Sequence, residues 1–268
     1  MSYDVAGARR ESEGRNFRDI VSERLVAHGG WCMIPSAFAT EIMSASGCDW
    51  LCIDTQHGLI DDAAMRVMVQ AAAIRSTPVT VRVPWNDPAS IMRALDAGAD
   101  GVIVPMVNTP DDARLAVGAS KYPPLGFRSW GPVRSTMAWP GFNPSVGNEQ
   151  TVCIVMIETE EAYDNLEVIL DVPGMGGVFV GPNDLAISHA GSNEGAGSST
   201  KDVEMIERIA QECARRSLVA GISCSGGEDA RRWEKAGYTL LALQSDAAVL
   251  GEGTGSLLAS ARGPDRPA

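Results

Sequence analysis

Eight short apolar runs, each followed by a longer helical pattern, constrain the fold of this chain more than any other feature. Alternation of this kind builds βα units around a parallel sheet. The apolar runs predict strands over 31–35, 50–54, 79–83, 101–105, 152–158, 177–181, 218–223 and 240–243. The helical patterns predict helices near 37–46, 61–76, 88–97, 110–120, 160–171, 202–217, 227–236 and 245–261, which complete eight units.

The length of the chain agrees with that pattern. It has 268 residues, close to the roughly 250 that are typical of a (β/α)8 barrel. We therefore predict the α/β class and a (β/α)8 TIM barrel, with an extra N-terminal helix near 16–28 that can plug the barrel bottom. One catalytic domain is expected over 16–262, between flexible segments at 1–15 and 263–268.

Two predicted connections are longer than the usual few residues. The segment 121–150 carries large aromatic and basic side chains, so we expect an ordered loop that leans over the barrel mouth and selects the substrate. The segment 188–201 is rich in Gly and Ser, which is typical of a mobile surface loop.

Composition excludes several classes of protein. The net charge is −12 and the chain has only three lysines, whereas nucleic-acid binding needs clustered basic residues. No apolar run approaches the roughly 20 residues that span a bilayer, and the polar first residues resemble no secretory signal. We therefore expect no nucleic-acid partner, no membrane association and a cytoplasmic location. The six cysteines form no CxxC pair and are expected to be reduced core residues: Cys32, Cys48, Cys52, Cys153, Cys213 and Cys224.

Polar residues at the ends of the predicted strands are the candidates for function, because a (β/α)8 barrel builds its active site there. Five stand out: Asp54, His57, Arg82, Glu158 and Asp184.

Glu158 and Asp184 follow consecutive strands, and neighbouring strands lie about 4.8 Å apart. Two carboxylates that converge either share a proton or bind a cation. Hard oxygen ligands favour Mg²⁺, Mn²⁺ or Co²⁺ and leave positions open for the carboxylate and keto oxygens of a 2-oxo acid. The alternatives are a helix-capping salt bridge for Glu158 and an Asx turn for Asp184. Their adjacent strand ends favour the metal.

His57 is the only histidine predicted at a strand end, and a carboxylate from Asp54 would orient its ring for acid–base work. The alternative is a core histidine bonded to the backbone. Arg82 has apolar neighbours and therefore needs an anionic partner. That partner is either Asp54 or Asp100 in an internal ion pair, or the oxyanion of a bound substrate.

An imine mechanism is disfavoured, because Lys121, Lys201 and Lys235 fall at a loop start and in two helices rather than inside the mouth. The glycine-rich run GISCSGGED (221–229) is a weak candidate for phosphate binding, as in barrel isomerases that act on sugar phosphates.

Six segments carry a resemblance to a known family: GGWCMIPSAFATEIMSASGCDWLCIDTQHG, VRVPWNDP, LDAGADGVIVPMV, KYPPLGFRSWGP, IETEEAYDN and GVFVGPNDLAIS. In these segments, across about 25–250, the chain resembles the HpcH/HpaI aldolases, which are class II pyruvate aldolases of the 4-hydroxy-2-oxoheptanedioate aldolase type.

The resemblance implies a function for each matching residue. Glu158 and Asp184 would bind a divalent metal (Mg²⁺, Mn²⁺ or Co²⁺), Arg82 would steady the oxyanion, and His57 with Asp54 would handle the proton. Substrate binding would involve the remaining matching positions: Trp31 at the mouth and the turn of Gly181, Pro182, Asn183 and Asp184, through its backbone N–H groups.

The resemblance also implies an assembly. The family usually forms trimers or hexamers and exchanges its last helix, and Asp96 resembles a residue that reaches a neighbouring subunit's site. The last helical pattern here is interrupted by glycines, DAAVLGEGTGSLLASA.

Two positions depart from the family's pattern: Gln56 stands where Glu is frequent, and Met156 where Gln is frequent. Gln56 precedes His57, and Met156 removes an amide donor beside the expected metal, so substrate preference or rate is expected to differ. Arg128 and Ser223 are further candidates. Arg128 and Arg134 would bind a distal carboxylate of the substrate or pair with Asp111 or Asp112.

The expected reaction is reversible cleavage of a 4-hydroxy-2-oxo acid to pyruvate, or hydroxypyruvate, and an aldehyde. Decarboxylation of an oxaloacetate-type acid, or a biosynthetic enolate addition, would use the same site. A barrel isomerase and a non-catalytic binding barrel are the more distant alternatives.

Overall fold

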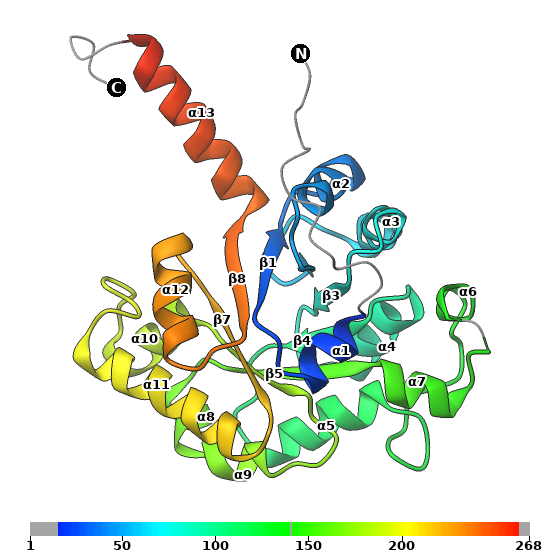
Figure 1. The fold of residues 1–268 in the computed structure, drawn as a ribbon. Coiled ribbons are helices and arrows are strands. Elements are labelled where there is room, and N and C mark those ends of the chain that lie inside the picture. Colours follow the sequence, from blue (N-terminus) through cyan, green and yellow to red (C-terminus); the bar gives the residue numbers. More distant parts are fainter. Residues whose placement is uncertain (1–15, 140, 263–268) are drawn as a thin grey trace.

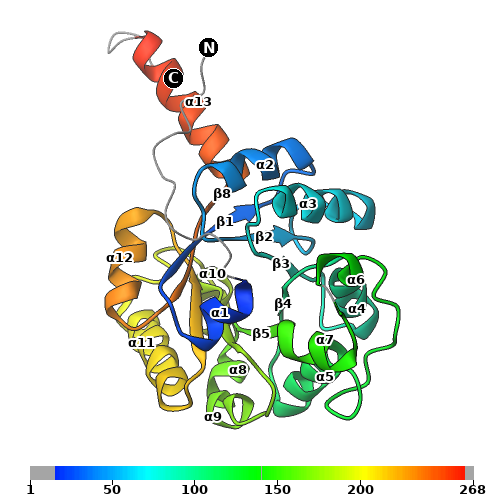
Figure 2. The same cartoon turned by 45° about the vertical axis from the view of Figure 1, so that its right-hand side comes forward.

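Eight parallel strands close into a barrel in chain order, with β8 paired to β1 (Figures 1 and 2). The computed structural model describes residues 16–139 and 141–262, so the segments predicted at 1–15 and 263–268 lie outside the described residues. The (β/α)8 fold predicted from the sequence is confirmed. The strands are β1 (Ala27–Cys32), β2 (Trp50–Asp54), β3 (Val79–Arg82), β4 (Gly101–Val104), β5 (Val152–Ile157), β6 (Gly177–Val180), β7 (Val219–Ser223) and β8 (Leu240–Ser245).

The first strand begins earlier than predicted. It starts at Ala27 and ends at Cys32, whereas the sequence pattern placed it over 31–35. Gly29 lies in its middle and is required there, because a methyl group on its Cα would come within 2.2 Å of the Trp50 ring. Gly29 is therefore a strand residue rather than part of a turn, and its missing side chain leaves room for the Trp50 indole of β2.

The bottom of the barrel is closed by α1 (Phe17–Ser22), which is much shorter than the predicted 16–28. Phe17 is fully buried, and its ring lies 5.8 Å from that of Trp50. The expected plug is therefore present. It is formed by about one and a half helical turns, and it is shorter than predicted because the chain enters β1 at Ala27.

The outer helices follow the predicted order with small differences at their ends. The region 160–171 contains two short helices that meet at Asn165 rather than one, and α10 was not predicted as a helix. The helices that follow the strands are α2 (Ala37–Ala45), α3 (Asp62–Ile74), α4 (Pro88–Asp96), α5 (Pro110–Ser120), α8 (Glu160–Asp164), α9 (Leu166–Leu170), α10 (Pro182–Ala190), α11 (Thr200–Arg215) and α12 (Gly227–Lys235).

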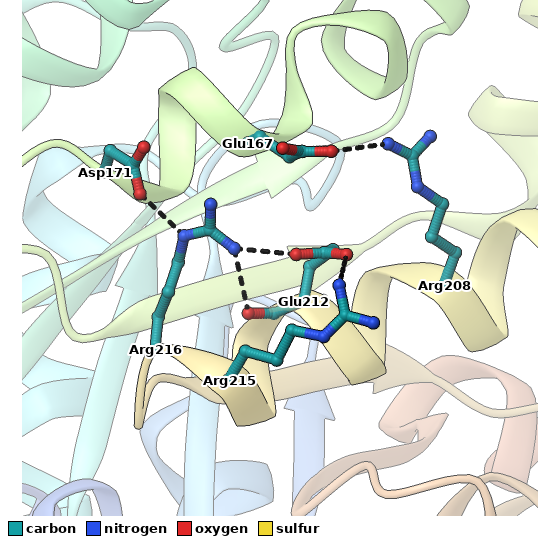
Figure 3. Close-up of polar contacts among 6 residues, drawn as sticks. All are labelled: Glu167, Asp171, Arg208, Glu212, Arg215 and Arg216. Atoms are coloured by element: carbon teal, nitrogen blue, oxygen red, sulfur yellow. Dashed lines mark hydrogen bonds and ion pairs between the residues drawn. The ribbon is translucent and has the colours of Figure 1, made fainter.

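Ion pairs join α9 to α11 on the outside of the barrel, as Figure 3 shows. Arg216 donates to Asp171 at 2.7 Å and to Glu212 at 2.7 Å, and Arg208 donates to Glu167 at 3.1 Å. Most of these side chains are exposed, so each pair stabilises the packing only weakly.

The last helix, α13 (Asp246–Arg262), projects away from the barrel in both views instead of completing the ring of helices (Figures 1 and 2). Only Asp246, at its start, is buried. Four large apolar side chains along it are at least 46% exposed: Val249, Leu250, Leu257 and Leu258.

The described parts of the connection 121–150, which are 121–139 and 141–150, lie at the other end of the barrel from the predicted position. The connection contains α6 (Ser135–Ala138) and α7 (Pro144–Gln150), and Arg134 within it lines a cavity with Val79 and Asp100, where β3 and β4 begin. A segment that leads from a helix into a strand must reach the strand's first residue, which explains this position. The connection 191–199 instead joins α10 to α11, and it lies near the mouth, where residues 196–198 line a cavity with Pro182 and Ser223.

Among the described residues, none of the helices is long and apolar enough to cross a membrane. All six cysteines are free, and the prediction as core residues is confirmed for the five that are buried, whereas Cys48 is half-buried at the edge of the core.

Candidate active site

A cavity of about 260 Å³ lies at the carboxyl ends of the strands and brings most of the predicted residues together. Nine of them line it: Trp31, His57, Arg82, Met156, Gly181, Pro182, Asn183, Asp184 and Ser223. Asp54 and Glu158 lie against these residues, at 0% and 3% exposure.

The two predicted metal ligands converge above Gly181. A methyl group on the Gly181 Cα would lie 3.0 Å from Glu158 Oε2 and 3.4 Å from Asp184 Oδ2. Strand pairing produces this arrangement, because Ile157 of β5 is level with Val180 of β6. A glycine at this position therefore leaves open a space that two carboxylate oxygens face.

The environment of Glu158 opposes its negative charge. The pKa of this carboxyl is raised to about 7, chiefly by burial and to a lesser extent by the neighbouring Asp184, against the lowering effects of the Met106 N–H and Arg82. A cation between the two carboxylates would offset this cost.

Met106 holds the Glu158 carboxylate in place, a contact that no sequence pattern indicated. Its backbone N–H donates to Glu158 Oε1 at 2.7 Å. The residue has a φ of 55°, in the left-handed region that a methionine rarely adopts. Backbone strain of this kind gathers at functional sites.

Arg82 and Asp54 form a buried, two-pronged ion pair. Arg82 Nε lies 2.9 Å from Asp54 Oδ1, and Nη2 lies 2.6 Å from Oδ2. Trp31 Nε1 also donates to Oδ2, at 3.2 Å. Burial raises the pKa of Asp54, but the hydrogen bonds and charge of Arg82 outweigh it and hold that pKa below its ordinary value. The internal ion pair that the sequence left open therefore exists, with Asp54 rather than Asp100.

The expected contact between Asp54 and the His57 ring is absent from the described structure. Asp54 Oδ1 instead accepts the backbone N–H groups of Gln56, at 3.0 Å, and His57, at 3.3 Å. The carboxylate is occupied by Arg82, Trp31 and this turn, so the exposed His57 ring faces the cavity without it. The Gln56 side-chain oxygen is buried, and it has no hydrogen-bond partner among the described residues.

Arg128 and Asp96 lie outside the mouth cavity and bind each other at 2.6 Å. The alternative partners proposed for Arg128 were wrong, because Asp111 pairs with Arg114 and Asp112 accepts the N–H of Thr109 at the start of α5. The Arg134 guanidinium donates to the Ala97 carbonyl.

None of the three lysines lines the mouth cavity. Lys121 is buried below the barrel, where its ammonium group donates to the carbonyl of Asn148 at 2.7 Å. Lys201 pairs with Glu160 at 2.9 Å on the outer surface. These positions agree with the argument against an imine.

The donor set suits a hard divalent cation. No group of three or more His, Cys, Asp or Glu side chains gathers anywhere in 16–139 or 141–262. Glu158 and Asp184 could supply two anionic oxygens to such a cation, with the remaining coordination positions left to water or substrate.

A closed (β/α)8 barrel with paired carboxylates, a buried arginine and a histidine around a small mouth cavity defines an enzyme of the barrel class. Comparison with known proteins then narrows the class. The family model "HpcH/HpaI aldolase/citrate lyase" matches residues 29–251. The chain belongs to this family of lyases, as the sequence resemblance predicted.

Two named relatives are similar over nearly the whole chain. The chain is 35% identical to a hydroxypyruvate/pyruvate aldolase of Rhizorhabdus wittichii, over 88% of this chain and 94% of that one. It is 33% identical to a 4-hydroxy-2-oxo-heptane-1,7-dioate aldolase of Klebsiella pneumoniae, over 91% and 92%.

A solved structure of an HpcH/HpaI aldolase/citrate lyase family protein from Burkholderia cenocepacia superposes with a TM-score of 0.84 at 29% identity, covering 92% of this chain and 98% of that one. Macrophomate synthase superposes with a TM-score of 0.81 at 26% identity, covering 92% and 89%.

Proposed function

We propose that this protein is a divalent-metal-dependent aldolase that reversibly cleaves a 4-hydroxy-2-oxo acid to pyruvate, or hydroxypyruvate, and an aldehyde. The convergence of Glu158 and Asp184 above Gly181, beside Arg82, is the observation that carries this proposal. The names of the relatives, a hydroxypyruvate/pyruvate aldolase and a heptanedioate aldolase, support it.

Glu158 and Asp184 would hold Mg²⁺, Mn²⁺ or Co²⁺, which when bound supplies a Lewis acid for the 2-oxo group. In the cleavage, the C4 hydroxyl loses its proton, the C3–C4 bond breaks and the aldehyde leaves. The electron pair of that bond becomes the enolate of pyruvate, and a proton added at C3 gives the product.

Arg82 binds the enolate oxygen in this proposal. Its Nε and Nη2 are committed to Asp54, so the ion pair fixes the guanidinium plane and leaves Nη1 for the substrate. A donor that is already oriented needs no reorganisation as negative charge develops.

The first turn of α10 binds the substrate carboxylate. Gly181 caps this helix without a side-chain hydrogen bond, so the N–H groups of Asn183 and Asp184 remain available as donors. Pro182 has no N–H and fixes the first turn.

His57 takes the C4 hydroxyl proton, directly or through a water molecule. Its ring is exposed to the cavity, and no acidic side chain holds it in the described residues, so it is free to approach the substrate.

The proposal is tested by chelation and product analysis. Thorough treatment with EDTA should abolish release of pyruvate and aldehyde from a 4-hydroxy-2-oxo acid, and Mg²⁺, Mn²⁺ or Co²⁺ should restore it. Full activity after chelation would contradict the metal assignment. Release of CO₂ without an aldehyde would identify a decarboxylase instead.

Assembly as a homotrimer or homohexamer in the cytoplasm, with Asp96 reaching a neighbouring subunit's site, remains a prediction. The exposed apolar side chains of α13 support the assembly, since large apolar surfaces are usually covered.

A further inference from the structure

A second cavity, of about 370 Å³, adjoins the cavity at the barrel mouth. The two share four wall residues: Pro182, Asn183, Ser223 and Cys224. The far wall of the second cavity comes from 196–198, in the connection before α11, and from Asp229, Arg232 and Trp233 of α12. The second cavity therefore lies next to the part of the mouth cavity that Ser223 and Cys224 line.

Two opposite charges with unused hydrogen-bonding capacity face this second cavity. Asp229 Oδ2 accepts the N–H and the hydroxyl of Ser225, at 3.0 and 3.2 Å, and Oδ1 has no partner among the described residues. Arg232 Nη1 donates to the Gly197 carbonyl at 3.1 Å, and its guanidinium lies 4.3 Å from the Trp233 ring centre. Within the described residues 16–139 and 141–262, no ion pair joins Asp229 to Arg232, and the neighbouring Arg231 lies 3.9 Å from Glu228 instead.

We propose that this second cavity binds the aldehyde portion of the substrate, and that it selects an uncharged aldehyde bearing hydroxyl groups. The inference rests on the proposed aldolase function and adds the substrate class. Asp229 and Arg232 are the residues that determine specificity.

Hydroxyl groups fit these walls because each can both donate and accept a hydrogen bond. One hydroxyl can donate to Asp229 Oδ1 while another accepts from the free nitrogens of Arg232. A terminal carboxylate or sulfonate would face the Asp229 charge, and an alkyl chain would leave both charged groups without partners.

The connection 191–199 shapes this cavity, whereas 121–150 lies at the opposite end of the barrel. Its position is fixed by Asp202, whose Oδ2 accepts the Gly197 N–H at 3.1 Å. Asp202 in turn contacts His189 at 2.5 Å, with both side chains at most 5% exposed. The wall is therefore anchored to α10 and α11.

The wild-type protein is assayed first in the aldol direction, with pyruvate and hydroxypyruvate as donors. The acceptors are glyceraldehyde, propanal and succinic semialdehyde. We expect kcat/KM to be at least tenfold higher for glyceraldehyde than for the other two. A preference for succinic semialdehyde or propanal would overturn the inference.

The variant Asp229→Ala should lower kcat/KM for glyceraldehyde about tenfold, the effect of losing one hydrogen bond to a charged group. The value for propanal should stay within twofold. The matched control is Glu228→Ala, which removes a neighbouring carboxylate that is 98% exposed and does not line the cavity. It should change neither value.

A second variant is needed because Asp229→Ala could act by disturbing the structure of α12 rather than by removing a contact with the aldehyde. Ala196→Leu fills the cavity from the opposite wall and should lower kcat/KM for glyceraldehyde more than that for the two-carbon glycolaldehyde. If both variants change all aldehydes equally, or change none, the second cavity is not the aldehyde site.

Exchange of the pyruvate methyl protons with D₂O separates this inference from the proposed function, because it needs no aldehyde. Exchange should persist unchanged in Asp229→Ala and Ala196→Leu. Failure of selectivity with intact exchange would overturn the aldehyde site alone, whereas absence of exchange in the metal-loaded wild type would overturn the aldolase proposal on which it rests.

Discussion

At the scale of single residues, the site contains two kinds of side chain: those that position other side chains, and those that are free to contact the substrate. Asp54 is fully buried and bound by Arg82, Trp31 and two backbone N–H groups. His57, three residues later, is exposed and has no side-chain partner among the described residues. Asp54 is therefore a positioning residue for Arg82, and His57 is the candidate for proton transfer.

Replacing His57 tests that division. His57→Ala should lower kcat for cleavage by a factor of about 10² to 10⁴, the usual contribution of a general base. The free energy of unfolding should stay within about 0.5 kcal/mol of wild type, because His57 is exposed and an exposed side chain contributes little to stability. Steady-state kinetics and urea unfolding measure the two effects.

The control is His28→Ala, at the start of β1 and the other end of the barrel. It should leave kcat unchanged. Wild-type turnover in His57→Ala would exclude the histidine from the proton transfer.

The sequence predicted the residues of the site better than their contacts. Strand ends in a parallel barrel face one side, so nine candidates share a cavity as expected. The choice between His57 and Arg82 as the partner of Asp54 depends on rotamers and on a turn, which residue spacing does not encode. The left-handed Met106 that orients Glu158 has no sequence signature either.

At the scale of elements, β8 and the start of α13 close the barrel against β1. Asp246 is 7% exposed, and its carboxylate accepts the Met33 N–H at 2.8 Å and the Ile34 N–H at 3.2 Å. These donors lie just beyond the end of β1, whose ladder with β8 shifts register earlier, between Gly29 and Trp31. One side chain therefore satisfies backbone groups that the strands leave unpaired.

Removing this carboxylate should destabilise the barrel. We expect Asp246→Ala to lower the free energy of unfolding by about 1 to 3 kcal/mol, because two part-buried N–H groups lose their acceptor. Urea unfolding measures the change.

Glu252→Ala, an exposed position on the same helix, is the matched control and should change stability by less than about 0.5 kcal/mol. Equal free energies of unfolding for the two variants would show that water can accept the two N–H groups in place of the Asp246 carboxylate.

Helices and strands were predicted well where the apolar pattern is strong. They were predicted poorly where their bounds or positions depend on contacts with distant parts of the chain. The strand 50–54 was predicted with its observed ends, because all five of its residues are buried. The glycines of β1 and the position of 121–150 depend on which strands and ends lie together. Those contacts exist only in the closed barrel.

At the scale of the whole molecule, a part-buried carboxyl at the barrel bottom makes stability depend on pH. Burial raises the pKa of Asp100 to about 6, against the lowering effect of the Val79 N–H, which it accepts at 2.8 Å. Between about pH 4 and pH 6 the folded protein therefore binds more protons at this site than the unfolded chain does. The free energy of unfolding contributed by Asp100 falls as pH rises through this window.

Asp100→Asn should remove this dependence, because the amide keeps an oxygen for the Val79 N–H and carries no charge. Relative to wild type, the variant should be unchanged near pH 4 and more stable by about 1 to 2 kcal/mol at pH 7, allowing for solvent screening. Urea unfolding at both pH values measures the difference, and equal differences at pH 4 and pH 7 would assign the pH dependence to other groups.

Exchange of the pyruvate methyl protons with D₂O, followed by NMR, tests most directly whether Glu158 and Asp184 support formation of an enolate through a bound metal. We expect no exchange by the metal-stripped protein, exchange after addition of Mg²⁺, Mn²⁺ or Co²⁺, and none by Glu158→Gln under any of these conditions. Undiminished exchange by the stripped protein or by Glu158→Gln would contradict the assignment of these two carboxylates as the metal ligands.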